Sequence, residues 1–520
     1  MGNLAHLEQL LGAVTASQVT ALIVVAFLLL SLLNPESPTV PNAPVHGRRW
    51  RWEPAVWLQY RFIFGSHKII SSGYDKYKDR PFVVKRSDMN FTVLPHKYLN
   101  ELRLVPETKL SAAVAQAQNI SHKWTETTVL TESRLHFRVL QTKLGGELSK
   151  YLDIIKDELD YAWELHMPNS KDWQEVEIQK EVQMLVARTS AKVFVGYPAC
   201  RNEQWLKVSV GYTIDIFLTA FAIRIFPTWL HPIIAQLIPA RYRIVKQLKS
   251  ARRILEPLVE KHTDAVRRRA LGENVDEEDT LMNWMLDNGT KDENRIDKLV
   301  RRQISLTLAS IHTTTGVCTS AIFELCARPE YIPMLREEIE NVTKELGPIG
   351  SSPEASSKQW LQRLEKLDSF FLEIQRVNPL ILLAPQRVAL ESLTLKDGTH
   401  IPKGSRICWA GYNHTNDPSI TPNPEVFDPL RSYNKRHSSP DQMNKHLAGQ
   451  TSPDYLGFGY GKLACPGRHF AVNEIKLMMA RLIMEYDFKF PDNMASRPRV
   501  MYTDEFMFTD PNARIMMRLR

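Results

Sequence analysis

Residues Phe458 to Ala471 read FGYGKLACPGRHFA and place one cysteine between a glycine-rich turn and the start of a predicted helix. The helix is indicated by the residues that follow, because apolar side chains recur in Val472 to Tyr486 at intervals of three and four residues. The glycines let the backbone approach a flat ligand closely. The unpaired N–H groups at a helix N-terminus favour a thiolate over a thiol. These features distinguish Cys465 as a candidate thiolate.

The other four cysteines have no comparable surroundings. They are scattered without C-x-x-C spacing in a chain of 520 residues, which is long enough to bury a large core without covalent cross-links. We expect them to be small buried hydrophobic residues of a protein in a reduced compartment. They are Cys200, Cys318, Cys326 and Cys408.

The cysteine loop closely resembles the haem-binding loop of the cytochromes P-450. The match runs through Phe458, Gly459, Gly461, Cys465, Gly467 and Ala471. The resemblance implies haem b as the cofactor, with the thiolate of Cys465 as the axial ligand of the iron. It also implies that Phe458, Gly459 and Gly467 lie against the cofactor.

Further signatures of that family occur in the expected order. Glu373 and Arg376 in EIQR lie three residues apart, on one helix face, where a carboxylate and a guanidinium pair. In the family this pair joins a downstream arginine to lock the fold around the haem, and FDPLR supplies Arg431. Arg387 in APQRVAL matches the arginine that binds a haem propionate, for which a planar guanidinium is suited. The alternative for Arg387 is a solvated arginine on a strand.

A charge-free stretch from Gln303 to Phe323 is too rich in hydroxyl groups for lipid, so we expect a long helix buried in protein. Within it, ASIHTT falls where the family carries a small-small-x-acid-Thr-Thr pattern. Thr313 is predicted to hold a water and pass protons to oxygen. The alternative is a threonine that only hydrogen-bonds its own helix. His312 replaces the usual acid, and is either a proton relay or a satisfied core group.

Two departures from the family pattern concern the haem propionates. Leu463 stands two residues before Cys465, where an arginine or histidine is common, so Lys462 is the candidate base. No Trp-x-x-x-Arg occurs in the region Arg134 to Lys143, which leaves the haem contacts of that segment unassigned.

The chain begins with a candidate membrane anchor. No charged residue occurs from Gln9 to Pro35, and Val19 to Leu33 reads VTALIVVAFLLLSLL, which suits one membrane-spanning helix. Glu8 precedes this run and three arginines follow it, so the positive-inside rule keeps the rest of the chain in the cytosol. A cleaved signal peptide is the alternative, but it requires a positive n-region and a cleavage site, and neither is evident.

The resemblance implies a mainly α fold with a smaller β-rich region near the N-terminal part of the catalytic unit. We expect a single-pass protein of the endoplasmic reticulum with its catalytic domain facing the cytosol. The expected parts are an N-terminal membrane anchor (1–36), a proline-rich hinge (37–56) and a haem-thiolate catalytic domain (57–520).

The charge balance disfavours nucleic acid as a partner. The chain carries 66 Lys and Arg against 58 Asp and Glu, a net charge of +8, without a long block of one sign. A mild excess suits a face that meets anionic lipid or an acidic partner. The resemblance implies that this partner is a membrane-bound NADPH-cytochrome P-450 reductase, which would dock near Lys462 and Arg468.

Thiolate ligation of haem favours cleavage of the O–O bond, so the resemblance implies a monooxygenase that uses O2. The expected pocket segments carry few charges and indicate a bulky lipophilic substrate. These segments are Ser305 to Thr315, Leu380 to Ala384, Phe506 to Phe508 and Ile214 to Ile238.

The strings SIHTT, EIQRVNP and GKLACPGR look most like those of fungal family members that oxidise diterpenes and related secondary metabolites. Two other functions stay open. One is a haem-thiolate isomerase or dehydratase that needs no reductase, against which the retained Thr313 argues. The other is a non-catalytic haem-binding sensor or electron carrier.

Overall fold

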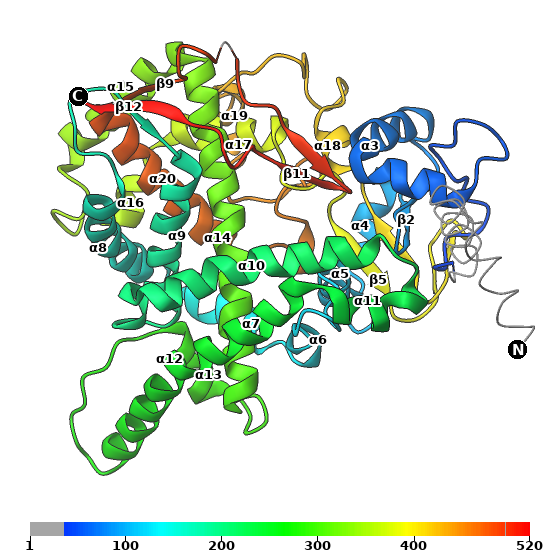
Figure 1. Cartoon of the computed structure of the whole chain (residues 1–520). Helices are drawn as coiled ribbons and strands as arrows, with labels where there is room; N and C mark the ends of the chain where they lie inside the picture. The colour runs from blue at the N-terminus through cyan, green and yellow to red at the C-terminus, as the bar shows by residue number, and fades with distance from the viewer. Residues whose placement is uncertain (1–35, 495) are drawn as a thin grey trace, which may run out of the picture.

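The computed structural model describes residues 36–494 and 496–520, and helices dominate this part of the chain (Figure 1). The predicted mainly helical fold is thus confirmed. The predicted anchor lies outside the described residues, except for its last residue. In chain order the α-helices are α3 (Ala55–Lys76), α4 (Leu99–Leu102), α5 (Ala112–Asn119), α6 (Val129–Glu132), α7 (Leu135–Val139), α8 (Leu148–His166), α9 (Ile178–Phe194), α10 (Glu203–Arg224), α11 (His231–Leu237), α12 (Pro239–Ala270), α13 (Leu281–Asn288), α14 (Ile296–Ala327), α15 (Ile332–Leu346), α16 (Ser357–Gln362), α17 (Glu365–Val377), α18 (Gly411–Thr415), α19 (Arg431–Arg436) and α20 (Arg468–Glu485).

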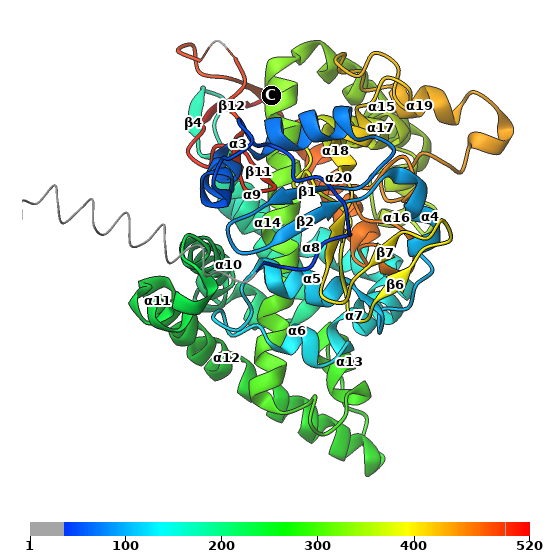
Figure 2. The ribbon, with the colours of Figure 1, turned by 90° about the vertical axis from the view of Figure 1, so that its right-hand side faces the viewer.

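The largest sheet, whose strands β1 and β2 face the viewer in Figure 2, combines strands from distant parts of the sequence. Its order is β1-β2-β8-β5-β3, in which β2 and β8 are parallel and the other neighbours antiparallel. The sequence led us to expect this β-rich region near the N-terminal part of the catalytic unit. Two of its strands instead come from after α17, so the region is only partly N-terminal. The strands of this sheet are β1 (Phe82–Lys85), β2 (Asn90–Val93), β3 (Leu110–Ser111), β5 (Gln386–Ala389) and β8 (Arg406–Cys408).

Three smaller sheets complete the β structure of the described residues. β4 and β9 flank β12 in one of them, which joins the C-terminus to the middle of the chain. The pair β10-β11 is a hairpin, and β6-β7 is another two-stranded unit. The bounds are β4 (Gln174–Val176), β6 (Leu393–Thr394), β7 (His400–Ile401), β9 (Tyr486–Lys489), β10 (Met501–Thr503), β11 (Phe506–Phe508) and β12 (Ile515–Leu519).

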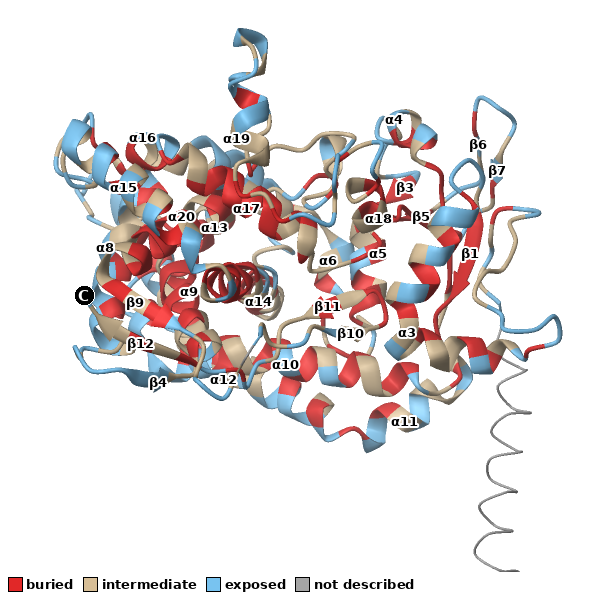
Figure 3. Ribbon diagram, turned by 90° about the horizontal axis from the view of Figure 1, so that it is seen from above, coloured by how far each residue is buried: buried red, intermediate tan, exposed pale blue. Residues whose placement is uncertain are grey.

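α14 runs through the middle of the helical part, where it packs against α9, α10, α12, α17 and α20. Figure 3, which looks along α14, shows buried residues around much of its circumference. The hydroxyl groups on this helix are compatible with burial because a helix carbonyl can accept from them; Thr307 donates to the carbonyl of Ile304 at 2.8 Å. The predicted buried helix over Gln303 to Phe323 is confirmed.

The described part of the proline-rich segment packs against the large sheet. Val45 forms a parallel bridge with Val83 of β1, and the backbone N–H of His46 donates to the carbonyl of Val83 at 2.8 Å. Val40 is buried in a small apolar cluster beside this sheet. Pro54 then precedes the first residue of α3, a position that suits the fixed φ of proline. This segment therefore sets where α3 begins.

One described helix, α10, is long and apolar enough to span a membrane by length and composition alone. However, 56% of its most apolar window is buried inside the protein. α10 packs against both α12 and α14, as a core helix does.

Candidate active site

The cysteine loop is held in a tight conformation by its own backbone. The N–H of Cys465 donates to the carbonyl of Phe458 at 2.8 Å, which closes the loop. Gly459 and Gly461 both have a φ of +75°, a backbone conformation that side chains other than glycine rarely adopt. Gly467 then caps α20, so Cys465 stands just before a helix N-terminus, as the sequence predicts.

The sulfur of Cys465 lies where a thiolate is stabilised by backbone groups. Burial raises the pKa of the Cys465 thiol, while hydrogen bonds from the backbone N–H groups of Gly467 and Arg468 and the charge of Arg468 lower it. Cys465 is the only exposed cysteine of the five, yet its sulfur is surrounded by protein. Both observations fit a sulfur on the wall of an opening inside the protein. The four other cysteines are buried or half-buried, as expected.

α14 presents one open face within the otherwise packed core. Ala309 and Thr313, four residues apart and thus on the same side of the helix, are both exposed. The hydroxyl of Thr313 donates to the carbonyl of Ala309 at 2.7 Å. Both interpretations of this threonine are therefore compatible with the geometry, because an Oγ that donates to its own helix still has lone pairs that can accept from a water.

His312 points away from the open face of α14. Its Nδ1 lies 3.2 Å from Nε2 of Gln183 on α9, and its Nε2 lies 3.4 Å from the carbonyl oxygen of Val210 on α10. Burial lowers the pKa of His312 to about 4, so the imidazole is neutral at pH 7. These contacts are those of a hydrogen-bonded core histidine, the second of the two interpretations considered from the sequence.

One ion-pair cluster joins Glu373, Arg376 and Arg431, as the family resemblance predicts. Arg376 binds both carboxylate oxygens of Glu373, at 2.5 and 2.9 Å, and both side chains are almost completely buried. Nε of Arg431 lies 3.3 Å from the same carboxylate. Both guanidinium groups also donate to the carbonyl of Val426, so the cluster ties α17 to the segment before α19.

Arg387 lies on β5 as a buried guanidinium. It donates one hydrogen bond, at 2.8 Å, to the carbonyl of its neighbour Gln386, and forms no ion pair with any described residue. Burial lowers the pKa of Arg387 to about 10. Because an unpaired buried cation is costly, this position favours an anionic ligand.

The expected pocket segments lie together. The ring of Phe506 on β11 is 5.9 Å from that of Phe217 and 6.2 Å from that of Phe221, both on α10. β11 also follows the segment after α17, since the N–H of Met507 donates to the carbonyl of Leu380 at 3.0 Å. The side chain of Leu380 in turn lies against Gly316, one turn beyond Thr313 on α14. Apolar and aromatic residues therefore form a wall near the open face of α14.

A sequence profile of the cytochromes P-450 matches residues 87–517. The chain belongs to the cytochrome P-450 family. It is therefore an oxidoreductase of the monooxygenase class, whose cofactor is haem b with a cysteine thiolate as axial ligand.

Several curated relatives of the chain are fungal cytochromes P-450. A cytochrome P-450 monooxygenase of Stachybotrys chlorohalonatus is 43% identical over 483 residues, which cover 92% of this chain and 91% of that protein. The ent-kaurene oxidase of Fusarium fujikuroi is 36% identical over 489 residues, which cover 93% of this chain and 89% of that protein. Among solved structures, the cyanobacterial CYP120A1 with retinoic acid bound has a TM-score of 0.65 and 16% identity, covering 93% of this chain and all of that one (100%), and shows the shared fold.

The residues of this cytochrome P-450 fit the haem that its family binds. Cys465 offers a sulfur that receives backbone N–H groups and faces an opening. Arg387 offers a buried cation that forms no ion pair among the described residues, as a propionate requires. Phe458, which was predicted to lie against the cofactor, packs at the edge of the main apolar core.

Two basic residues that sequence reasoning left unassigned, Arg134 and His136, lie at the start of α7 in this cytochrome P-450. Arg134 stacks on Phe137 at 4.0 Å and pairs with Glu107. The buried Nδ1 of His136 has no hydrogen-bond partner among the described residues. Arg134 helps to line a cavity of about 470 Å³ between the loop and α7. The lining residues are Leu104, Val105, Pro106, Glu107, Arg134, Phe137, Gln141, Lys462 and Leu463.

From the sequence, both residues could have been identified as candidate haem contacts by their basic side chains, because they lie in the region where the family carries Trp-x-x-x-Arg. Lys462, the base proposed from the sequence, is exposed at the rim of this cavity. Arg468, in contrast, is partly buried and donates to the carbonyls of Cys465 at 2.7 Å and Gly449 at 3.0 Å. It therefore holds the loop, and Lys462 is the freer of the two for a docking partner.

Proposed function

We propose that this chain is a membrane-anchored monooxygenase that hydroxylates or further oxidises a bulky lipophilic substrate, a terpenoid-type secondary metabolite of a fungal pathway. The observation that carries the proposal is the aromatic wall of Phe217, Phe221 and Phe506 beside the open face of α14. Such a wall binds a large apolar skeleton by burial and offers few polar groups to a charged one. The ent-kaurene oxidases among the relatives support a terpenoid substrate.

In this proposal, the haem is held by a small set of residues. The Cys465 thiolate would bind the iron, and Arg387 would pair with a propionate. Leu463 stands where the family often has a base that binds a propionate. Arg134, together with Lys462 at the cavity rim, would take over that role. Gly459 and Gly467 keep side-chain bulk away from the ligand plane.

When bound, the haem supplies the oxidant that inserts one oxygen atom of O2 into the substrate. The residues of the chain provide the surroundings for this reaction. The Oγ of Thr313 accepts a hydrogen bond from a water on the open face of α14 and passes protons inward. His312 has no direct part in that transfer, because both of its ring nitrogens face α9 and α10. The apolar wall excludes other water and orients the substrate.

Electrons are proposed to come from NADPH through a membrane-bound cytochrome P-450 reductase. The exposed side chain of Lys462 on the cysteine loop is the basic contact proposed for this acidic partner. Relatives named as monooxygenases support this function over an isomerase or a sensor.

The substrate and the redox partner can be tested in one assay. Full-length protein in vesicles with reductase, NADPH and a panel of tetracyclic diterpene hydrocarbons is expected to yield a product that carries one atom of isotopically labelled O2. Omission of the reductase should abolish turnover. Thr313→Ala is expected to slow product formation about 100-fold, while NADPH oxidation continues. The matched control is Thr319→Val, which changes a buried threonine whose hydroxyl has no hydrogen-bond partner within residues 36–494 and 496–520.

Three outcomes would contradict the proposal. Turnover without reductase would indicate an isomerase or dehydratase. A haem spectrum without any turnover on terpenoids, fatty acids or steroids would indicate a sensor. Equal coupling of NADPH to product in Thr313→Ala and wild type would remove the proposed proton path.

Membrane attachment is proposed to combine the apolar N-terminus with a surface of the catalytic part. Exposed apolar side chains gather where α10 ends and around α11: Ile225, Trp229, Ile233 and Leu237. Others lie before α3 and in its first half: Trp50, Trp52, Trp57 and Phe64. The two groups are neighbours, because the hydroxyl of Tyr60 donates to the carbonyl of Ile225 at 2.6 Å. Aromatic residues next to arginines are typical of a membrane interface.

Removal of residues 1–36 is expected to convert the protein from an integral to a peripheral membrane protein. Full-length protein should stay in the membrane pellet after extraction at alkaline pH, whereas the shortened protein should be released by that extraction but still bind neutral lipid vesicles. Replacing Ile233 and Leu237 by serine in the shortened protein should weaken vesicle binding. Alkaline release of the full-length protein would rule out the anchor.

A further inference from the structure

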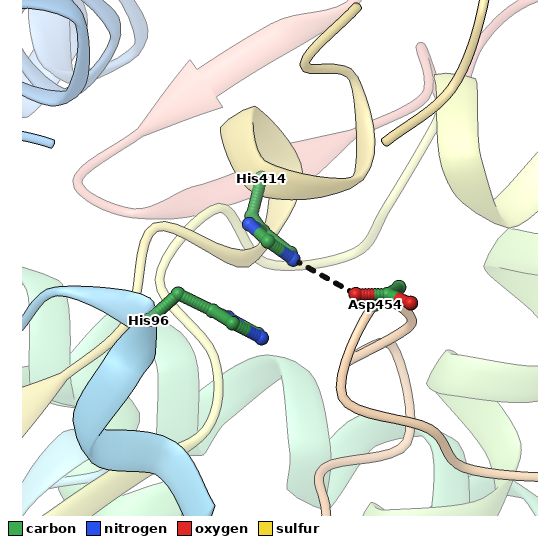
Figure 4. Close-up of side chains that lie close together, drawn as sticks. All are labelled: His96, His414 and Asp454. Atoms are coloured by element: carbon green, nitrogen blue, oxygen red, sulfur yellow. Dashed lines mark hydrogen bonds and ion pairs between the residues drawn. The ribbon is translucent and has the colours of Figure 1, made fainter. Parts of the chain in front are cut away.

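Two histidines stack face to face where three segments of the chain meet (Figure 4). His96 lies in the single-turn helix η1 (His96–Tyr98) before α4, and His414 lies in α18. Their ring centroids are 3.6 Å apart and the rings are inclined by only 10°. Asp454, in the segment that leads to the cysteine loop, lies with one carboxylate oxygen 3.5 Å from Nε2 of His414.

The polar atoms of this cluster are poorly matched with one another. The buried Nδ1 of His96 has no hydrogen-bond partner among the described residues. The contact between His414 and Asp454 is at the outer limit of a hydrogen bond. Leaving a buried ring nitrogen without a partner costs free energy, so a group that binds it would stabilise this arrangement.

Both imidazoles are in the form that binds a metal ion. Burial, assisted by the neighbouring His414, lowers the pKa of His96 to about 4. The pKa of His414 is also lowered, chiefly by burial, against the opposing effect of Asp454. At pH 7 the two rings are therefore neutral, and each keeps a free lone pair.

We propose that His96, His414 and Asp454 bind a divalent transition-metal ion of the zinc type. The three residues can each direct one ligand atom so that all lie within 4.8 Å of one another. In a tetrahedral zinc site with bonds of 2.0–2.1 Å, the ligand atoms are about 3.3 Å apart. Because an imidazole nitrogen binds a metal ion within the plane of its ring, the two nearly parallel rings would leave their stacked arrangement and turn toward one another when the ion binds, and the exposed Asp454 side chain would rotate to meet it.

The ligand types select among metal ions. Two imidazoles with one carboxylate suit Zn²⁺ and neighbouring transition metals, whereas Mg²⁺ and Ca²⁺ prefer oxygen ligands. The net charge of the set is −1, so a divalent ion leaves the site only slightly positive. Because Asp454 is exposed, a water can complete the fourth position.

A metal at this place would connect three segments that surround the cysteine loop. η1 leads through α4 to the Leu104 side of the cavity beside Lys462. Asp454 belongs to the turn in which Ser452 bridges Tyr455, just before the loop. α18 is anchored to α17 through Asn416, whose side chain donates to the carbonyl of Arg376 at 3.0 Å. The ion would therefore act as a structural cross-link and would take no part in oxygen chemistry.

The test uses full-length, untagged, haem-loaded protein that has been treated with a chelator and then dialysed against micromolar Zn²⁺. Mass spectrometry of the elements gives zinc and haem iron in the same sample. Wild type is expected to retain about one zinc per haem iron, as one site of three protein ligands implies. Asp454→Asn and His96→Gln should each weaken zinc binding by at least about tenfold, without loss of haem iron.

His400→Gln is the matched control, because His400 is an exposed histidine on β7 outside the cluster. It should retain zinc as wild type does. Equal zinc retention in all four proteins, or none in wild type, would show that the stacked histidines serve only packing. The iron readout separates either result from a failure of the haem assignment.

Discussion

Replacing Cys465 by alanine is expected to abolish the absorption band at about 450 nm that a reduced, carbon-monoxide-bound haem-thiolate protein shows, together with all monooxygenase activity. The thiolate is the one sulfur that faces the opening, and no other cysteine can replace it, because the remaining four are buried or half-buried elsewhere. The measurement is a reduced carbon-monoxide difference spectrum combined with a count of haem per chain.

A second substitution keeps this prediction testable if the alanine variant loses its haem. Cys465→His should retain haem through a nitrogen ligand but shift the band away from the thiolate position. Cys326→Ala, which changes a half-buried cysteine on α14, is the control and should keep the wild-type spectrum. A wild-type band in either Cys465 variant would overturn the assignment of the ligand.

The parts of the site that could be predicted from sequence are those encoded in short segments. Gly459, Gly461 and Cys465 lie within seven residues, so their turn and the following helix are determined locally. The pairing of Glu373 with Arg376 follows from helical spacing in the same way. In each case the interaction partners are close in sequence, so the local backbone conformation brings them together, a glycine turn in the first case and a helix in the second.

Other features depend on contacts between distant segments. His312 and Thr313 are adjacent in sequence, but successive helix residues point about 100° apart, and only the packing of α9 and α10 on α14 decides which of them is open. The large sheet joins β1 and β2 to β5 and β8 across some 300 residues of chain. Arg387 could be matched to a motif, but its burial without an ion pair is visible only in three dimensions.

Glu373→Gln is expected to lower the free energy of unfolding substantially. The carboxylate of Glu373 accepts hydrogen bonds from two nitrogens of the buried Arg376 and from the backbone N–H of Asp428 at 2.9 Å, and it pairs with one nitrogen of Arg431. The amide of glutamine keeps the shape but removes the negative charge, so two guanidinium groups lose their counter-ion. Breaking a buried ion pair in this way costs about 3–5 kcal/mol, a large part of the total stability of a typical protein.

The loss should appear first around the haem, because the cluster ties α17 to the segment that leads toward the cysteine loop. We expect a lower haem content and an absorption band shifted away from the thiolate position, as for a haem that has lost its thiolate ligand. In a denaturant titration, the variant should unfold at a lower denaturant concentration than wild type. Glu256→Gln removes the same charge from an exposed pair with Arg252 on α12, and should change none of these. If the two variants behaved alike, the buried cluster would have no special part in holding the haem site. If Glu373→Gln lost stability but kept its spectrum, the cluster would support α17 without acting on the loop.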